Sequence, residues 1–457
     1  SRYQINSLYG IVNLSYKDYL FVELTGRNDW NSVLATAKRT DNVGFFYPSI
    51  NTSFVLSDVA KLPSYINYAK IRASLAQVGS GSTTPYRTAY TYPLARNGTY
   101  PDSALINPRI LPNENLKPLK TTTFELGTEI QMFKRRLSLD VAVYWGKTNN
   151  QILTRTVDRS SGYDAAVINA GQVNNSGVEV AINGKPIVRR NGINWSMFAT
   201  FSTNRNKIVS MPDSAVLLRA GQIASGQIVA SIGGSMGDVY GLGYQRSPDG
   251  QVIYDPTTGF PKVTEEIIYL GNTTPRYKMS LGNTLSYRGL SLKVLFDAQL
   301  GAVSYSLTHY KMVEQGKLKV TLPGRYNGII GNGVLEVFDA DGNVVGYRKN
   351  DVVAIDIDEY YRYHMGAYNA EGSVFKTDFL KFREASLIYS LRPKLLKKIG
   401  LKSASVGIYG RDLFIWSPWP MFDPEFGTLS GTDIVRGFEV GQFPSTRTVG
   451  FNLSIGL

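Results

Sequence analysis

The last twelve residues of the chain, 446–457, alternate strictly between two kinds of side chain. Val449, Phe451, Leu453 and Ile455 are apolar, and the residues between them are small or polar. Because successive side chains of a β-strand point to opposite faces, this period of two predicts a strand with one apolar face. If the pattern recurs many times along the chain, lipid can cover the apolar faces and the strands can close as a membrane β-barrel.

The pattern does recur. In 137–149, for example, Leu139, Val141 and Val143 alternate with polar or small residues, and in 290–301 the same holds for Leu292 and Val294. A bulge is expected within 378–390, where the alternation breaks. The sequence predicts an all-β chain with about thirteen strands: 7–16, 19–28, 45–57, 67–78, 122–132, 137–149, 175–185, 193–206, 278–287, 290–301, 378–390, 403–415 and 446–457.

The connections between these strands alternate between short and long. This alternation is typical of an outer-membrane barrel, which has short turns on the periplasmic side and long loops outside. The last strand follows a long loop, so it runs inward and the first strand does too. The short connections are 17–18, 58–66, 133–136, 186–192, 288–289 and 391–402, and the long ones are 29–44, 79–121, 150–174, 207–277, 302–377 and 416–445.

The strand count is odd, whereas bacterial single-chain barrels have even numbers of strands. A bilayer does not tolerate an open sheet with two unpaired edges. We therefore interpret residues 1–457 as the C-terminal portion of one larger transmembrane antiparallel β-barrel domain. Its last strand is expected to pair with 403–415 on one side and with an upstream strand on the other.

Composition excludes several other classes. The chain contains no cysteine, which rules out disulfides and thiolate metal sites. It has no apolar run long enough for a transmembrane helix, and residues 1–9 show no signal-peptide core. The net charge of +13 is carried by scattered Lys and Arg residues without a basic helix, so we expect no nucleic-acid partner.

Motifs across nearly the whole chain resemble the C-terminal half of SusC-type, RagA-like TonB-dependent outer-membrane transporters of Bacteroidetes. They occur in the order of that family, and together they are specific. They are YGIVNLSYKDYL at 9–20, RND at 27–29, FYPS at 46–49, IRAS at 71–74, LKP at 116–118 with TTTFELG at 121–127, NAGQVNNSGVEV at 169–180, YG at 240–241, TP at 274–275, DFLKFREASLIY at 378–389, GRDLF at 410–414 and PSTR at 444–447.

The resemblance implies a 22-stranded barrel whose plug, TonB-contact segment and first nine strands lie upstream of these residues. It also implies import of oligosaccharides or peptides across the cell outer membrane, with a SusD-like surface lipoprotein as a lid. The alternative is a barrel of the same fold that scaffolds a surface complex without transporting. A secreted all-β sandwich is a third possibility, although it would not explain the alternation of loop lengths.

Four aromatic residues in or beside the predicted outer loops are candidates for binding substrate: Tyr240, Trp416, Trp419 and Phe422. Aromatic ring faces stack on sugar rings and also bind peptide side chains. The alternative for each is an aromatic girdle at the membrane interface or packing within a loop.

No enzyme is expected, because no nucleophile motif is present and Glu125 and Glu129 fit a polar pore lining. Asp339, Asp341 and Asn343 resemble the start of a calcium loop, so calcium is the one cofactor considered. The glutamate expected at the twelfth loop position is absent, and an Asp-Gly hairpin turn is the favoured interpretation. The two histidines, His309 and His364, share one loop and predict no zinc site.

Overall fold

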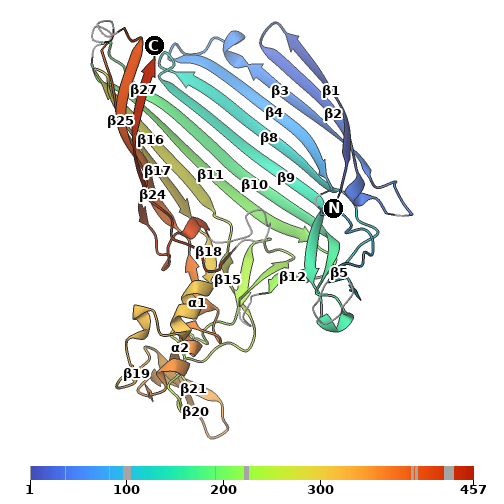
Figure 1. The fold of residues 1–457 in the computed structure, drawn as a ribbon, viewed down its shortest axis with the longest axis vertical. Coiled ribbons are helices and arrows are strands. Elements are labelled where there is room, and N and C mark those ends of the chain that lie inside the picture. Colours follow the sequence, from blue (N-terminus) through green and yellow to red (C-terminus); the bar gives the residue numbers. More distant parts are fainter. Residues whose placement is uncertain are drawn as a thin grey trace.

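The computed structural model describes residues 1–457 except 1, 37, 82, 96–103, 191, 221–225, 393–395, 397–399, 427–436 and 457. One large sheet dominates it, and short hairpins and helices form a layer at one end of that sheet (Figure 1). No helix within the described ranges is both long and apolar enough to cross a membrane. The all-β class predicted from the sequence is confirmed.

Thirteen strands cross the large sheet in chain order, each antiparallel to the next, and they correspond one for one to the predicted segments. A short fourteenth strand, β7 (Ile110–Leu111), pairs in parallel with β10. The thirteen are β1 (Ile5–Tyr16), β2 (Leu20–Asn31), β3 (Gly44–Val55), β4 (Ile66–Ser80), β8 (Leu119–Met132), β9 (Leu137–Thr156), β10 (Ala165–Ile187), β11 (Asn194–Ser210), β16 (Tyr277–Tyr287), β17 (Leu290–Leu300), β24 (Phe379–Ser390), β25 (Ser403–Trp416) and β27 (Thr448–Gly456).

The register separates an apolar face from a polar face. Residues paired across neighbouring strands point to the same side of a sheet. One continuous row of partners is entirely apolar: Val12, Leu24, Ile50, Leu75, Phe124 and Trp145. The next row lies on the opposite face and is polar: Asn13, Glu23, Asn51, Ser74, Glu125 and Tyr144. This is the pattern of a barrel wall between lipid and a polar lumen.

The sheet is open, with β1 and β27 at its two edges. The last strand pairs with β25, as predicted. Every residue of β1 is exposed, so no part of the chain that the structure describes covers either of its faces. β1 begins at the end of the sheet that carries the loop layer, and β27 ends at the opposite end (Figure 1).

Tight turns at the end opposite the loop layer use left-handed backbone conformations. Lys17 and Asp18 both have positive φ, and so do Arg288 and Gly289, which is what a two-residue hairpin requires. The predicted bulge in β24 is confirmed by a register shift between Phe382 and Glu384. The predicted short connection 186–192 holds an Asn-Gly pair typical of a hairpin turn, but its Asn191 lies outside the described residues.

The layer at the loop end contains most of the buried apolar side chains. One core cluster includes Ile228, Val239 and Tyr305, and another includes Tyr254 and Leu335. In its described segments the layer contains two α-helices, α1 (Leu307–Glu314) and α2 (Ile357–Met365). Its strands are β5 (Leu94–Ala95), β6 (Ala104–Leu105), β12 (Ala215–Ala220), β13 (Gly226–Ser231), β14 (Asp238–Gly241), β15 (Ile268–Asn272), β18 (Val303–Ser306), β19 (Ile329–Ile330), β20 (Val334–Phe338), β21 (Val344–Lys349), β22 (Val353–Ala354), β23 (Val374–Lys376) and β26 (Phe438–Glu439).

Short 3-10 helices complete the described chain. They are η1 (Ser32–Leu34), η2 (Leu56–Asp58), η3 (Arg159–Ser161), η4 (Lys319–Thr321), η5 (Glu371–Ser373) and η6 (Pro424–Phe426).

One predicted loop is wrong. Residues 150–174 are mostly strand, because β9 and β10 pair far beyond the predicted ends and leave only 157–164 as their connection. Polar side chains such as Asn149 and Gln151 end the apolar alternation there, but the backbone pairing continues.

Candidate functional site

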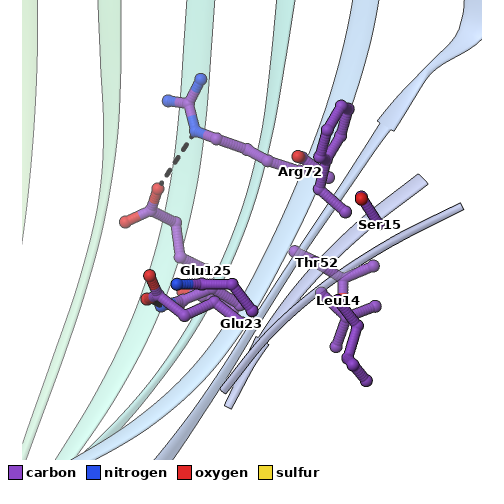
Figure 2. A pocket seen from close by; sticks show the side chains of 13 residues that line it. Leu14, Ser15, Glu23, Thr52, Arg72 and Glu125 are labelled. Atoms are coloured by element: carbon purple, nitrogen blue, oxygen red, sulfur yellow. Dashed lines mark hydrogen bonds and ion pairs between the residues drawn. The ribbon is translucent and has the colours of Figure 1, made fainter. Parts of the chain in front are cut away.

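The polar face of the sheet carries an ionic network around Arg72 of β4. The Arg72 guanidinium donates to both carboxylate oxygens of Asp140 on β9, each at 2.8 Å. Its Nε lies 3.5 Å from Oε1 of Glu125 on β8, the contact dashed in Figure 2. Beside it, Lys70 pairs with Glu129 at 3.1 Å. The two glutamates predicted to line the pore therefore lie on the polar face, each with its own cation.

A second network surrounds Lys381 and Arg383 of β24. The Lys381 ammonium donates to both carboxylate oxygens of Asp423, at 2.7 and 2.8 Å, and also to Glu425. Arg383 donates to Glu425 at 2.5 Å and to Asp297 of β17 at 2.8 Å. These bonds hold the segment 417–426, which follows β25, against the polar face of the sheet.

This Lys381 network is far less hydrated than the Arg72 network. The side chains of Lys381 and Asp423 are each only 4% exposed. Burial by itself would raise the pKa of the Glu425 carboxyl, but the hydrogen bonds from Arg383 and Lys381 outweigh it and lower that pKa below its ordinary value. Segment 417–426 is thus attached by ion pairs between groups that water barely reaches, so hydration would not compensate if these pairs broke.

A cavity of about 750 Å³ lies where the polar face meets the loop layer. We call it the loop-end cavity. Its wall includes Tyr144, Glu179 and Lys278 from the sheet and Ser304 and Glu425 from the loop layer. Ser304 is 5% exposed, and its hydroxyl has no hydrogen-bond partner among the described residues. A polar ligand in the cavity could supply that partner.

Two opposite charges line the loop-end cavity without an ion-pair partner in the described part of the chain. Glu179 of β10 and Lys278 of β16 both pair in register with Ser202 of β11, so they face the same side two strands apart. Sequence reasoning did not find these residues. The sequence does show one charged residue in each of these alternating strands. Only the order of the strands in the sheet, however, brings the two residues close together.

The four predicted aromatic residues occupy separate environments. Trp416 pairs with Leu380 on the apolar face and stacks on Phe414, a position that fits the interface-girdle alternative. Trp419 is buried against the Phe375 ring. Tyr240 packs edge-on against Tyr269, and Phe422 is 48% exposed. None of the four lines the loop-end cavity, so a role in binding substrate stays a prediction.

The Asp339–Asn343 segment forms the turn between β20 and β21. The Asp339 carboxylate accepts hydrogen bonds from the backbone N–H groups of Asp341 and Asn343, at 3.0 and 2.8 Å. The hydrogen bond from Asn343 is the main cause of the lowered pKa of Asp339. Since that carboxylate already caps the turn, its geometry agrees with the Asp-Gly hairpin. No cluster of three or more potential metal-ligating His, Asp or Glu residues is found within the described ranges.

The two histidines lie in the loop layer, His309 buried and His364 partly buried, and neither belongs to a cluster of three or more potential metal ligands among the described residues. His309 Nδ1 lies 3.1 Å from the Ser373 hydroxyl, and burial lowers its pKa to about 4. His364 Nδ1 lies 2.7 Å from the Tyr244 hydroxyl, and burial lowers its pKa as well. Both are therefore neutral packing residues at physiological pH.

Comparison with known families gives one extended match. The family model described as TonB dependent receptor-like, beta-barrel, matches residues 1–316. Among curated proteins, TonB-dependent receptor P26 of Formosa agariphila is 26% identical over 100% of this chain and 46% of its own length. TonB-dependent receptor SusC of Bacteroides thetaiotaomicron is 24% identical over 75% of this chain and 32% of its own length.

Solved structures show the same fold. The RagAB peptide importer in its closed-closed state superposes with a TM-score of 0.77 at 17% identity, over 100% of this chain and 48% of that chain. A structure of the RagAB peptide transporter gives a TM-score of 0.75, also at 17% identity, over 100% of this chain and 47% of that one. The chain spans about half the length of the curated relatives it matches across its whole extent.

Proposed function

Because this chain belongs to the TonB-dependent receptor-like β-barrel family and forms part of an outer-membrane barrel, we propose that the whole protein is a TonB-dependent importer of oligosaccharides or peptides. Within it, residues 1–457 form much of the pore wall and the long loops. A SusD-like surface lipoprotein is the proposed lid, in keeping with relatives that include a receptor named SusC.

The observation that best supports import is the continuous polar face that ends in the loop-end cavity. Its charged residues suit a water-filled lumen. Arg72 and Arg383 form ion pairs between strands, and Glu179 and Lys278 are left to interact with a polar ligand. A hydrated path leading to a polar cavity under the loops is what a carrier of polar oligomers needs.

The open edges support an upstream partner within the same barrel. β1 and β27 have unpaired backbone groups along one side, and in a bilayer those groups must find partners. An upstream barrel half would close the sheet, and a plug would cover its polar face. That upstream region would also carry the segment that contacts TonB.

The test is an uptake measurement on the whole protein in its native outer membrane. Cells receive fluorescent oligosaccharides or fluorescent peptides, and internal label is measured before and after the proton-motive force is dissipated. Import predicts accumulation of one ligand class that falls to background when the force is removed.

Mass spectrometry of what co-purifies with the protein tests the partner in the same preparation. A lipoprotein that co-purifies without any energy-dependent uptake would favour the scaffold alternative. Absence of both would overturn the proposal.

A further inference from the structure

The wall has a basic hollow at its loop end, between β11 and β16. The hollow measures about 920 Å³, and four cations line it: Arg205, Lys207, Arg276 and Lys376. We call it the basic notch. Among the described residues Asp378 is the one carboxylate in its lining, and it accepts a hydrogen bond from the Gly301 backbone N–H at 2.6 Å.

Strand register places Arg205 and Lys207, two of the four notch cations, on the apolar, lipid-facing side of the wall. Arg205 pairs with Ser176, which also pairs with Trp145 of the apolar row. Lys207 pairs with Asn174, which also pairs with Lys147. Arg205 and Lys207 therefore point away from the lumen, whereas their neighbours Asn204 and Asn206 face it and line both the loop-end cavity and the basic notch.

Arg205 and Lys207 lie beyond an aromatic band on the same face. Phe124 stacks on Trp145, and Phe201 stacks on Tyr277. Aromatic residues of this kind mark the boundary between hydrocarbon and headgroups. At a rise of about 3.3 Å per residue, Arg205 and Lys207 lie roughly 13 and 20 Å further along β11 toward the loops than Phe201. The basic notch is thus at headgroup depth.

No salt bridge involves any of these four cations within the described residues, although cations such as Arg72, Lys381 and Arg383 on the polar face are paired. Four positive charges around one hollow repel each other unless an anion joins them. The cations of the notch also account for part of the chain's net charge of +13.

We propose that the basic notch binds the phosphate group of a lipid headgroup in the leaflet that faces the loops. Arg205 and Arg276 offer forked donors that match phosphate geometry, and Lys207 and Lys376 add point charges. A lipid is the source because Arg205 and Lys207 face the membrane side of the wall. The proposal requires the barrel in its membrane, but it does not depend on what the barrel imports.

The test uses the whole protein, purified in mild detergent and stripped of lipid. Native mass spectrometry measures binding of a monophosphorylated disaccharide glycolipid, the same glycolipid after phosphatase treatment, and inorganic phosphate. The double variant Arg205→Gln/Lys207→Gln is expected to bind the phosphorylated glycolipid about tenfold more weakly than the native protein. The matched control, Lys134→Gln/Arg135→Gln, removes two exposed cations at the opposite end of the sheet and should bind normally.

Three outcomes would overturn the proposal. They are unchanged lipid binding by the double variant, equal binding of the dephosphorylated glycolipid, or inorganic phosphate that competes as well as the lipid. Loss of a co-purifying protein from the double variant, with lipid binding intact, would identify a protein interface instead. Uptake is measured on the same variants as well. If the lipid-binding proposal fails, uptake still tests the import proposal independently.

Discussion

The Lys381 ammonium is held by Asp423 and Glu425 in a place that water barely reaches. Replacing Lys381 with Met keeps much of the side-chain volume but leaves the buried Asp423 carboxylate without its cation, while Glu425 keeps Arg383. Breaking a buried ion pair from one side costs about 3 kcal/mol or more. We expect Lys381→Met to release segment 417–426, seen as faster protease cleavage in that segment and a lower thermal midpoint of the purified protein.

Lys293→Met is the matched control for that variant. Lys293 lies on the polar face of the adjacent strand β17, is exposed, and has no ion-pair partner in the described part of the chain. Its replacement should leave cleavage of 417–426 unchanged. If both variants behave alike, the network does not hold the segment.

His309 gives the loop layer a defined pH dependence. Its pKa falls from an ordinary value near 6.5 to about 4 in the folded protein, because burial disfavours the charged ring. The unfolded chain then binds more protons below pH 6.5, so the layer should lose stability from about pH 6.5 down to about pH 4 and level off below. The full loss is on the order of 3 kcal/mol.

Hydrogen exchange of α1 amides, corrected for intrinsic rates, measures this slope. In His309→Gln the slope should shrink, because the titrating group is gone, and the remaining slope should reflect His364, whose pKa is also lowered. A slope as steep in His309→Gln as in the native protein would assign the pH dependence to other groups.

At the scale of a single strand, Gly177 of β10 leaves room for the Tyr144 ring from β9. A Cβ at position 177 would overlap both that ring and the Thr203 carbonyl of β11. Gly177→Ala must therefore shift backbone as well as side chain, and we expect a loss of about 2 kcal/mol. The folded fraction, followed by heat-modifiable gel mobility, should fall.

Gly146→Ala is the fitting comparison for Gly177→Ala. Position 146 lies on the adjacent strand, where a new Cβ would meet only atoms at 3.4 Å or more. That variant should fold as well as the native protein. Similar losses in the two variants would mean that strand glycines act through backbone entropy rather than through the space they leave.

Periodicity predicted all thirteen strands because each is apolar on the face that lipid covers. The prediction failed at the loop end of the strands, beyond the part that lipid covers. Beyond Trp145 and Val178, strands β9 and β10 continue with residues such as Asn149 and Asn174, whose polarity looks like loop sequence. Helices α1 and α2 were not predicted either, because each is short and is stabilised by packing in the loop layer.

The site was less predictable than the fold. Glu125 and Glu129 could be placed on the polar face by counting, but their partners Arg72 and Lys70 come from another strand, β4. Lys381 and Asp423 lie 42 positions apart and meet only once β24 and the segment after β25 are placed. The basic notch depends on the gap between two strands that no local pattern encodes.

At the scale of the whole molecule, three features agree on one orientation. The polar face leads into the loop-end cavity, the aromatic band lies just inside the basic notch, and tight turns occupy the far end of the sheet. In an outer membrane this arrangement puts the loop layer outside and the tight turns in the periplasm.

That orientation can be tested directly, because these 457 residues contain no cysteine to give background labelling. Any cysteine upstream in the whole protein is first replaced by serine. Asp341→Cys places a thiol on the exposed β20–β21 turn, and Lys134→Cys places one on an exposed turn at the other end. A membrane-impermeant maleimide applied to intact cells should label position 341 fully and position 134 only after the outer membrane is permeabilised. The reverse pattern would put the loop layer in the periplasm, and both the lid partner and the outward position of the basic notch would then have to be abandoned.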